Sequence, residues 1–212
     1  MKGKNISLNA FAVMACGMML CLESVSFAHA GLTLDPTEQL RPFVEKLVLI
    51  LTDPDLQGEE KNLTRREKAL KAASDHIDFT EMSKRVLGKK WRQLSLDEKK
   101  DFVGLFTQLL KHAYIGKIEG YSQQKVEFKS QRIKGERAQV NTHIIDTDNV
   151  ISVSYIMLLK DDKWMVYDIV VEGVSLVRNY MVQFKEILRK DGYASLVQQV
   201  EGKIAELEQG NG

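Results

Sequence analysis

The sequence predicts an α+β protein in which a curved antiparallel meander of four strands is covered by N-terminal and C-terminal helices and encloses an apolar cavity. Apolar residues recur at helical spacing up to residue 114, at alternate positions over residues 125–171, and at helical spacing again from residue 174. Turn-forming residues at 134–135, 146–149 and 161–162 divide the alternating stretch into four strands joined by short turns. The strands and the following helix are richer in Val, Tyr, Trp, Met and Phe than a thin core requires, which indicates a container for an apolar ligand.

The first 30 residues have the pattern of a removable signal peptide. Lys2 and Lys4 precede an apolar stretch over residues 6–22, and an A-x-A site ends at Ala30. Lipoprotein processing at Cys16 is the alternative, and it is disfavoured because the apolar stretch continues beyond that residue. We therefore expect residues 1–30 to be a signal peptide and residues 31–212 to be a single exported domain. Both cysteines, Cys16 and Cys21, lie in the signal, so the exported domain has no disulfide and no thiolate ligand.

The charge of the exported domain is balanced. The chain has 30 Lys and Arg against 29 Asp and Glu, and removing Lys2, Lys4 and Glu23 leaves 28 of each. Such a balance predicts no nucleic-acid partner. Basic residues gather over residues 61–71 and 84–92, interleaved with carboxylates; they are typical of solvated helix faces, with a patch for lipid headgroups or an acidic partner as the alternative.

The first helix is predicted to begin at Asp35 and Pro36, with Glu38 in its first turn. Pro42 lacks a backbone donor, so it implies either a kink or a later start near Leu40.

Three further helices precede the strands. Asn62 or Thr64 caps a helix over residues 63–73, and Asp78 opens a short helix that stops at Gly88. A clear capping box begins at Ser95 and opens the most strongly patterned helix of the chain. The apolar faces of the last two helices carry Met82, Val86, Leu87, Phe102, Phe106, Leu109 and Tyr114.

The last two strands, 151–160 and 164–171, are predicted to pair through a two-residue turn at Asp161 and Asp162. This register places Leu159 opposite Trp164, Met157 opposite Val166 and Val153 opposite Val170. One face is then apolar apart from Asp168, which falls opposite Tyr155, while Ile169 and Val171 lie on the other face; helices are expected to cover one face only.

A helix over residues 174–190, with Ser175 as its cap, follows the sheet and presents Val177, Tyr180 and Phe184 on one stripe. A final helix carries Leu196, Val200 and Leu207.

Catalytic and metal-binding patterns are weak. His76, His112 and His143 are far apart in sequence, and Ser175 lies in G-V-S-L-V rather than in G-x-S-x-G. We expect no metal ion, no cofactor and no enzyme activity. The alternative is a small-molecule isomerase or hydratase that uses Asp168 and Tyr155; against it, Asp168 is expected to accept hydrogen bonds from Tyr155, a backbone N–H or a nearby cap. A third alternative is a chaperone-like module whose apolar face binds protein.

Two segments resemble the MlaC family, also called the toluene-tolerance family. They are residues 87–106, LGKKWRQLSLDEKKDFVGLF, and residues 172–184, EGVSLVRNYMVQF, and the resemblance extends over most of residues 35–207. It departs at Met181, where a basic residue is expected in many relatives.

The resemblance implies a periplasmic phospholipid shuttle that is not an enzyme. Such a protein carries a glycerophospholipid between an outer-membrane lipoprotein complex and an inner-membrane ABC transporter with an MCE-type subunit, and so maintains the lipid asymmetry of the outer membrane. The apolar faces described above give the residues expected to line the lipid cavity: Met82, Val86, Leu87, Phe102, Phe106, Leu109, Tyr114, Val153, Tyr155, Met157, Trp164, Val166, Val174, Val177, Tyr180 and Phe184.

Overall fold

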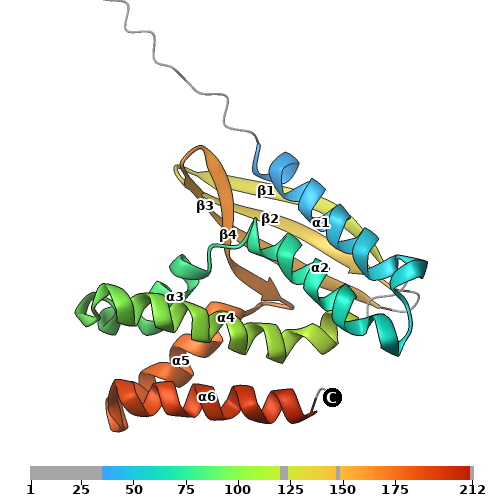
Figure 1. Cartoon of the computed structure of the whole chain (residues 1–212). Helices are drawn as coiled ribbons and strands as arrows, with labels where there is room; N and C mark the ends of the chain where they lie inside the picture. Colours follow the sequence, from blue (N-terminus) through green and yellow to red (C-terminus); the bar gives the residue numbers. More distant parts are fainter. Residues whose placement is uncertain (1–34, 120–123, 147–148, 211–212) are drawn as a thin grey trace, which may run out of the picture. The chain divides into compact units, whose positions relative to one another are not determined.

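A computed structural model describes residues 35–119, 124–146 and 149–210, and it confirms the α+β class (Figure 1). The predicted signal peptide, residues 1–30, lies outside the described residues. The helices are α1 (Pro36–Thr52), α2 (Asn62–Ser74), α3 (Phe79–Leu87), α4 (Leu96–Glu119), α5 (Leu176–Lys190) and α6 (Gly192–Gly210), with short 3₁₀ helices η1 (Pro54–Leu56), η2 (Glu59–Lys61) and η3 (Gly88–Gln93). The strands are β1 (Lys125–Lys134), β2 (Arg137–Ile145), β3 (Val150–Lys160), β4 (Lys163–Val171) and β5 (Val174–Ser175).

The sheet is an antiparallel meander with strand order β1-β2-β3-β4-β5. Asp161 and Asp162 have φ values of 49° and 61°, as the central residues of a tight two-residue hairpin turn require, and this confirms the predicted turn. The four predicted strands become five because Glu172 and Gly173, with φ values of 48° and 78°, turn the chain back for the two residues of β5. Two residues are too few to produce an alternating pattern, so the sequence did not predict this strand.

A β-bulge in β4 changes the register that the sequence predicted. Leu159 pairs with Trp164 and Met157 with Val166, as expected, but Ile156 then pairs with Asp168, which leaves Tyr167 as the additional residue. Beyond the bulge every side chain of β4 changes face. The predictions that Val153 pairs with Val170 and that Asp168 lies opposite Tyr155 are therefore wrong.

The corrected pairs beyond the bulge are Tyr155 with Ile169 and Val153 with Val171. Ile169 and Val171 thus lie on the same face as Met157, not on the opposite face as expected. Asp168 and Val170 lie on the other face.

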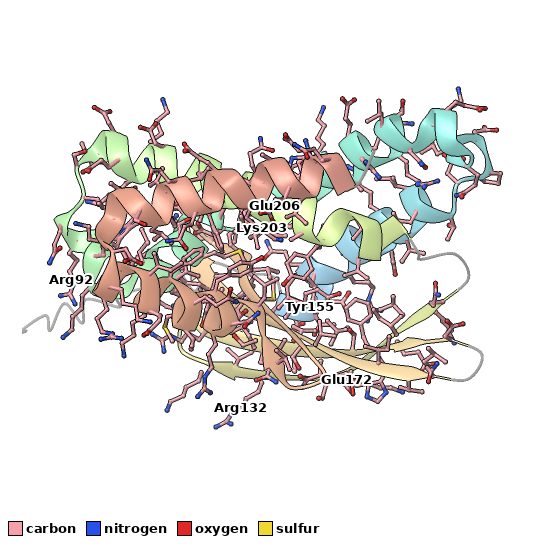
Figure 2. All side chains as sticks on the ribbon, turned by 90° about the horizontal axis from the view of Figure 1, so that it is seen from below. Arg92, Arg132, Tyr155, Glu172, Lys203 and Glu206 are labelled. Carbon is pink, nitrogen blue, oxygen red and sulfur yellow. The ribbon has the colours of Figure 1, made fainter. Side chains whose placement is uncertain are left out.

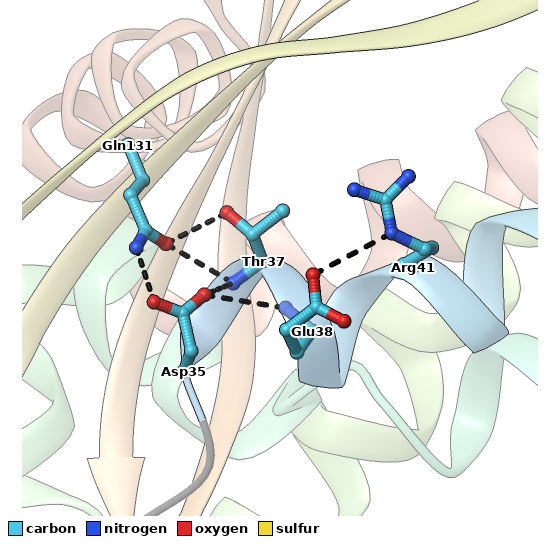
Figure 3. Close-up of polar contacts among 5 residues, drawn as sticks. All are labelled: Asp35, Thr37, Glu38, Arg41 and Gln131. Carbon is cyan, nitrogen blue, oxygen red and sulfur yellow. Dashed lines mark hydrogen bonds and ion pairs between the residues drawn. The ribbon is translucent and has the colours of Figure 1, made fainter.

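Helix α1 starts at Pro36, so the alternative start near Leu40 is wrong, and Pro42 lies inside the helix. The Asp35 carboxylate accepts hydrogen bonds from the backbone N–H groups of Thr37 (2.9 Å) and Glu38 (3.3 Å). Gln131 of β1 joins this cap: its side chain donates to Asp35 and accepts from the Thr37 hydroxyl at 2.7 Å (Figure 3). The start of α1 is thereby attached to the edge strand of the sheet.

The other helix starts differ in their caps. The cap residue of α2 is Lys61, whose side chain makes no capping hydrogen bond, so the expected caps Asn62 and Thr64 are wrong. Asp78 caps α3 through the N–H of Glu81 at 2.9 Å, as predicted. The capping box of α4 is also confirmed, with the Ser95 hydroxyl accepting from the N–H of Glu98 at 3.2 Å.

The buried apolar residues form two clusters. The sheet cluster lies between α1 and the sheet and contains Leu40, Phe43, Val44, Ala138, Val140, Met157, Trp164 and Val166. The helix cluster is formed mainly by α3, α4, α5 and α6, with Leu94 before α4 and Tyr167 from β4. It contains Met82, Val86, Leu87, Leu94, Phe102, Phe106, Leu109, Leu110, Tyr167, Val177, Phe184, Leu196 and Val200. Ile77, just before α3, packs against both clusters.

Both faces of the sheet contribute to these clusters. Ile156 and Leu158 of β3 and Tyr167 of β4 pack against the helix cluster, whereas Met157 and Val166 belong to the sheet cluster. The expectation that helices cover only one face is therefore wrong, because α5 and the rest of the helix cluster pack against Ile156, Leu158 and Tyr167 on the second face.

Candidate lipid-binding site

We call the sheet face that α1 covers the inner face. Its residues follow from the register: Ala138, Val140, Thr142 and Ile144 on β2 lie opposite Met157, Tyr155, Val153 and Ile151 on β3, and β4 adds Trp164, Val166, Ile169 and Val171. On these three strands the face is apolar apart from Thr142 and the hydroxyl of Tyr155. The Thr142 hydroxyl is satisfied by the backbone carbonyl of Val153 at 3.2 Å.

The cover over the inner face is uneven. At one end, Val140, Met157 and Val166 are at most 1% exposed beneath α1. At the other end, Ile151 is 38% exposed and Val171 is 43% exposed. We call this second region the open end; it also includes Val174 of β5, which pairs with Val171 and is 64% exposed. Apolar side chains that a protein leaves partly exposed on a sheet face are suited to contact with an apolar ligand.

An aromatic group lies at the centre of the helix cluster. The ring of Phe106 on α4 meets the rings of Tyr180 and Phe184 on α5 edge to face, with centroids 5.3 Å and 5.8 Å apart, and Phe102 lies 6.1 Å from Phe184. Burial raises the pKa of the Tyr180 hydroxyl well above its usual value, and the neighbouring hydroxyl of Tyr114 raises it further. Two tyrosine hydroxyls are thus held together within otherwise apolar surroundings.

Most of the residues predicted to line one cavity lie in two separate clusters in the structure, with Val174 outside both. Ten lie in the helix cluster or pack against it: Met82, Val86, Leu87, Phe102, Phe106, Leu109, Tyr114, Val177, Tyr180 and Phe184. Tyr155, Met157, Trp164 and Val166 belong to the sheet cluster or pack against it, and Val153 is buried on the inner face. Val174 is exposed at the open end and is not brought into either cluster.

The register adds residues that the sequence interpretation did not select. Ile144 and Ile151 pair across β2 and β3 at the open end, and Ile169 and Val171 reach the inner face through the bulge. Ile144 and Ile151 could have been found from the alternation alone. The two residues of β4 could not, because their face depends on the bulge.

Two hollows lie elsewhere on the described part of the chain. One, of about 440 Å³, lies between the start of α1 and β1 and is lined mainly by polar residues, among them Asp35, Thr37, Lys129 and Gln131. The other, of about 280 Å³, lies between α4 and α6 and is lined by Asp101, Phe102, Leu105, Tyr193, Val197 and Glu201. Neither is lined by a residue of β2, β3 or β4, so the enclosed cavity expected from the sequence stays a prediction.

Asp168 has a structural role. It is 8% exposed, and its carboxylate accepts hydrogen bonds from the Ser175 hydroxyl at 2.5 Å and from the N–H of Val177 at 2.9 Å. It therefore fixes the first turn of α5, whose cap Ser175 in turn accepts from the N–H of Arg178 at 2.9 Å. The expectation that Asp168 accepts from a backbone N–H and a nearby cap is confirmed. The pairing with Tyr155 that an acid-base enzyme would need is absent, because the two residues lie on opposite faces.

Two properties of the described residues limit the chemistry of the site further. No three His, Cys, Asp or Glu side chains among them are arranged to hold a metal ion. No described helix is both long enough and apolar enough to cross a membrane. What the described residues offer is an apolar sheet face that helices cover in part.

This combination of fold and apolar face agrees with the family comparison. The family model of the MlaC protein matches residues 42–202, so the chain belongs to the MlaC family. The resemblance seen in the two sequence segments is thereby confirmed.

Two known proteins show the likeness in more detail. The chain is 27% identical over 128 residues to the intermembrane phospholipid transport system binding protein MlaC of Haemophilus influenzae; the aligned part covers 58% of this chain and 60% of that relative. It is also similar to the solved structure of a phospholipid-binding protein from Ralstonia solanacearum in complex with a phospholipid. The TM-score is 0.74 and the identity 22%, over 82% of this chain and 99% of the other. The second likeness shows that the two chains share a fold.

Proposed function

We propose that this protein binds a phospholipid at the open end of its inner face and carries it through the periplasm. The observation that carries the proposal is the partly exposed apolar sheet face around Ile151 and Val171. Membership of the MlaC family supports it, as does the phospholipid bound to the structural relative from Ralstonia solanacearum. We further propose the partners that the family resemblance implies, an inner-membrane ABC transporter with an MCE-type subunit and an outer-membrane lipoprotein complex.

The physics of acyl chains explains why such a carrier needs an apolar site. Each methylene group withdrawn from water gains about 0.8 kcal/mol, so two acyl chains cannot cross an aqueous compartment unshielded. A membrane shelters the same methylene groups, and transfer between bilayer and protein is therefore close to balanced in free energy. Its direction then depends on the differential affinities of the partner complexes.

The test compares two isoleucines on the same sheet face. Phospholipid is extracted from purified protein with organic solvent and quantified by mass spectrometry. We expect stoichiometric phospholipid in the unaltered protein and at least about tenfold less in Ile151→Asp, because a carboxylate at the site must lose its hydration against acyl chains. Ile133→Asp is the matched control, since Ile133 is 49% exposed at the opposite end of the sheet and should retain the lipid.

The choice of Ile151 avoids confusing lipid loss with unfolding. Val166, although among the predicted lining residues, is 1% exposed, and its backbone bonds to His76 and Asp78 on the segment before α3. A charge there would break the core itself. Lipid-free protein purified from its native compartment, or equal lipid in both isoleucine variants, contradicts the proposal.

A second candidate, the protein-binding module, is favoured by the same exposed residues, because a protein partner could cover the open end instead of a lipid. The organic-solvent extraction of phospholipid distinguishes a lipid carrier from a protein-binding module. A module of this kind would contain no stoichiometric phospholipid.

A further inference from the structure

An exposed leucine, Leu96, lies far from the inner face in sequence and has different surroundings. Leu96, the first residue of α4, is 82% exposed. It follows η3, a six-residue segment with three cations and no carboxylate. Over residues 88–100 the chain carries five cations, Lys89, Lys90, Arg92, Lys99 and Lys100, against the two carboxylates Asp97 and Glu98.

We call this region the basic corner: Lys89, Lys90, Trp91, Arg92, Leu96, Lys99 and Lys100. Three of its cations are available for an external partner. Lys89, Arg92 and Lys100 are exposed, and among the described residues none of them has a carboxylate partner. Figure 2 shows Arg92 pointing outward at the end of the helices where α6 begins.

The corner is also held firmly in place. The ammonium group of Lys90 lies 5.5 Å from the ring of Tyr193 in α6, and that of Lys99 lies 5.8 Å from the ring of Trp91. Trp91 is half-buried and packs against the helix cluster. The corner therefore presents an apolar tip, a tryptophan and a set of cations on a rigid support.

The basic corner differs from a second exposed leucine, Leu63, in the charge that surrounds it. Leu63, the second residue of α2, is 72% exposed, but residues 55–67, the same span around it as residues 88–100 around Leu96, carry three cations and four carboxylates. Leu96 has a similar position at the start of a helix and a net excess of three positive charges nearby. The excess charge favours an anionic partner for the corner.

We propose that the basic corner docks the protein on an anionic phospholipid bilayer. Leu96 enters the boundary between headgroups and acyl chains, Trp91 lies at the level of the headgroups, and the cations face the lipid phosphates. A bilayer fits because it offers negative charge and apolar volume together. The proposal goes beyond the lipid site, since none of the corner residues lies on the inner face.

The experiment measures co-sedimentation of the protein, purified from cells that export it, with vesicles at low ionic strength. We expect binding to vesicles of mixed phosphatidylglycerol and phosphatidylcholine, and little to phosphatidylcholine alone. The triple variant Lys89→Gln, Arg92→Gln, Lys100→Gln should bind about 100-fold more weakly, since each cation near an anionic surface contributes about fivefold. Leu96→Ser should bind roughly tenfold more weakly, because it removes apolar groups from the bilayer.

Matched controls remove the same groups elsewhere. Lys46→Gln, Lys68→Gln, Lys71→Gln changes the total charge equally on α1 and α2, and Leu63→Ser removes an equally exposed leucine; both should bind as the unaltered protein does. Circular dichroism checks that each variant is folded. The proposal is overturned if the unaltered protein binds neither vesicle or both equally, or if the corner variants and their controls bind alike.

Discussion

On the three strands β2, β3 and β4, the two ends of the inner face are built from the same kind of residue and have opposite surroundings. Val140 and Met157 are completely buried, whereas Ile151 and Val171 are more than one-third exposed. The residues of α1 in or against the sheet cluster are Leu40, Phe43, Val44 and Leu47, and none comes from the last five residues of that helix. Alternation therefore determines which side chains share a face, whereas the path of the covering helix determines which part of that face is buried in the core.

The largest expected effect comes from placing the same charge at each end. Val140→Asp should destabilise the protein by more than about 4 kcal/mol, because an unpaired carboxylate would be buried in the sheet cluster. Ile151→Asp should cost less than about 1 kcal/mol in lipid-free protein. Chemical denaturation monitored by circular dichroism measures both, and equal losses would remove the distinction between the covered end and the open end.

The alternation predicted four strands and the apolar character of the inner face, and the capping patterns at Asp78 and Ser95 predicted where α3 and α4 begin. These signals are local, since they depend on residues within a few positions of one another. The bulge at Tyr167 is different, because an additional residue in β4 is defined only by its pairing with β3.

Less of the candidate site than of the fold could be predicted from the sequence. The sequence selected apolar residues correctly, but it could not separate those that pack against other side chains, such as Phe106, from those left uncovered, such as Val174. That separation depends on where helices lie in space. Asp168 shows the same limit. Only its strand pairing with Ile156 reveals that it lies on the opposite face of the sheet from Tyr155.

A smaller effect is expected where the sheet joins α5. Asp168→Ala should destabilise the protein by about 1–3 kcal/mol, because the N–H of Val177 and the hydroxyl of Ser175 lose their buried acceptor. Asp168→Asn keeps an acceptor oxygen and should recover part of the loss. Urea denaturation of both variants provides the measurement, and a neutral Asp168→Ala would show that the carboxylate does not support the helix start.

The smallest effect concerns the helix cluster at high pH. The pKa of Tyr180 is raised in the folded protein, so above the usual tyrosine pKa of about 10 the unfolded chain loses its proton first. The folded state then binds more protons than the unfolded state, and stability falls as pH rises, by at most about 1.4 kcal/mol per pH unit.

Tyr180→Phe removes the titrating hydroxyl and should make this fall shallower, although it leaves the ring in place. The free energy of unfolding of both proteins is measured from pH 8 to 11. Parallel curves would contradict the assignment of this pH dependence to Tyr180.

Photocrosslinking shows most directly whether acyl chains cover the open end of the inner face. A phospholipid with a diazirine in its acyl chain is loaded onto the protein and irradiated, and the modified residues are mapped by mass spectrometry. We expect adducts on β3 and β4 around Ile151 and Val171, with none around Ile133. Adducts confined to the hollow between α4 and α6, or no adducts from a loaded protein, would contradict it.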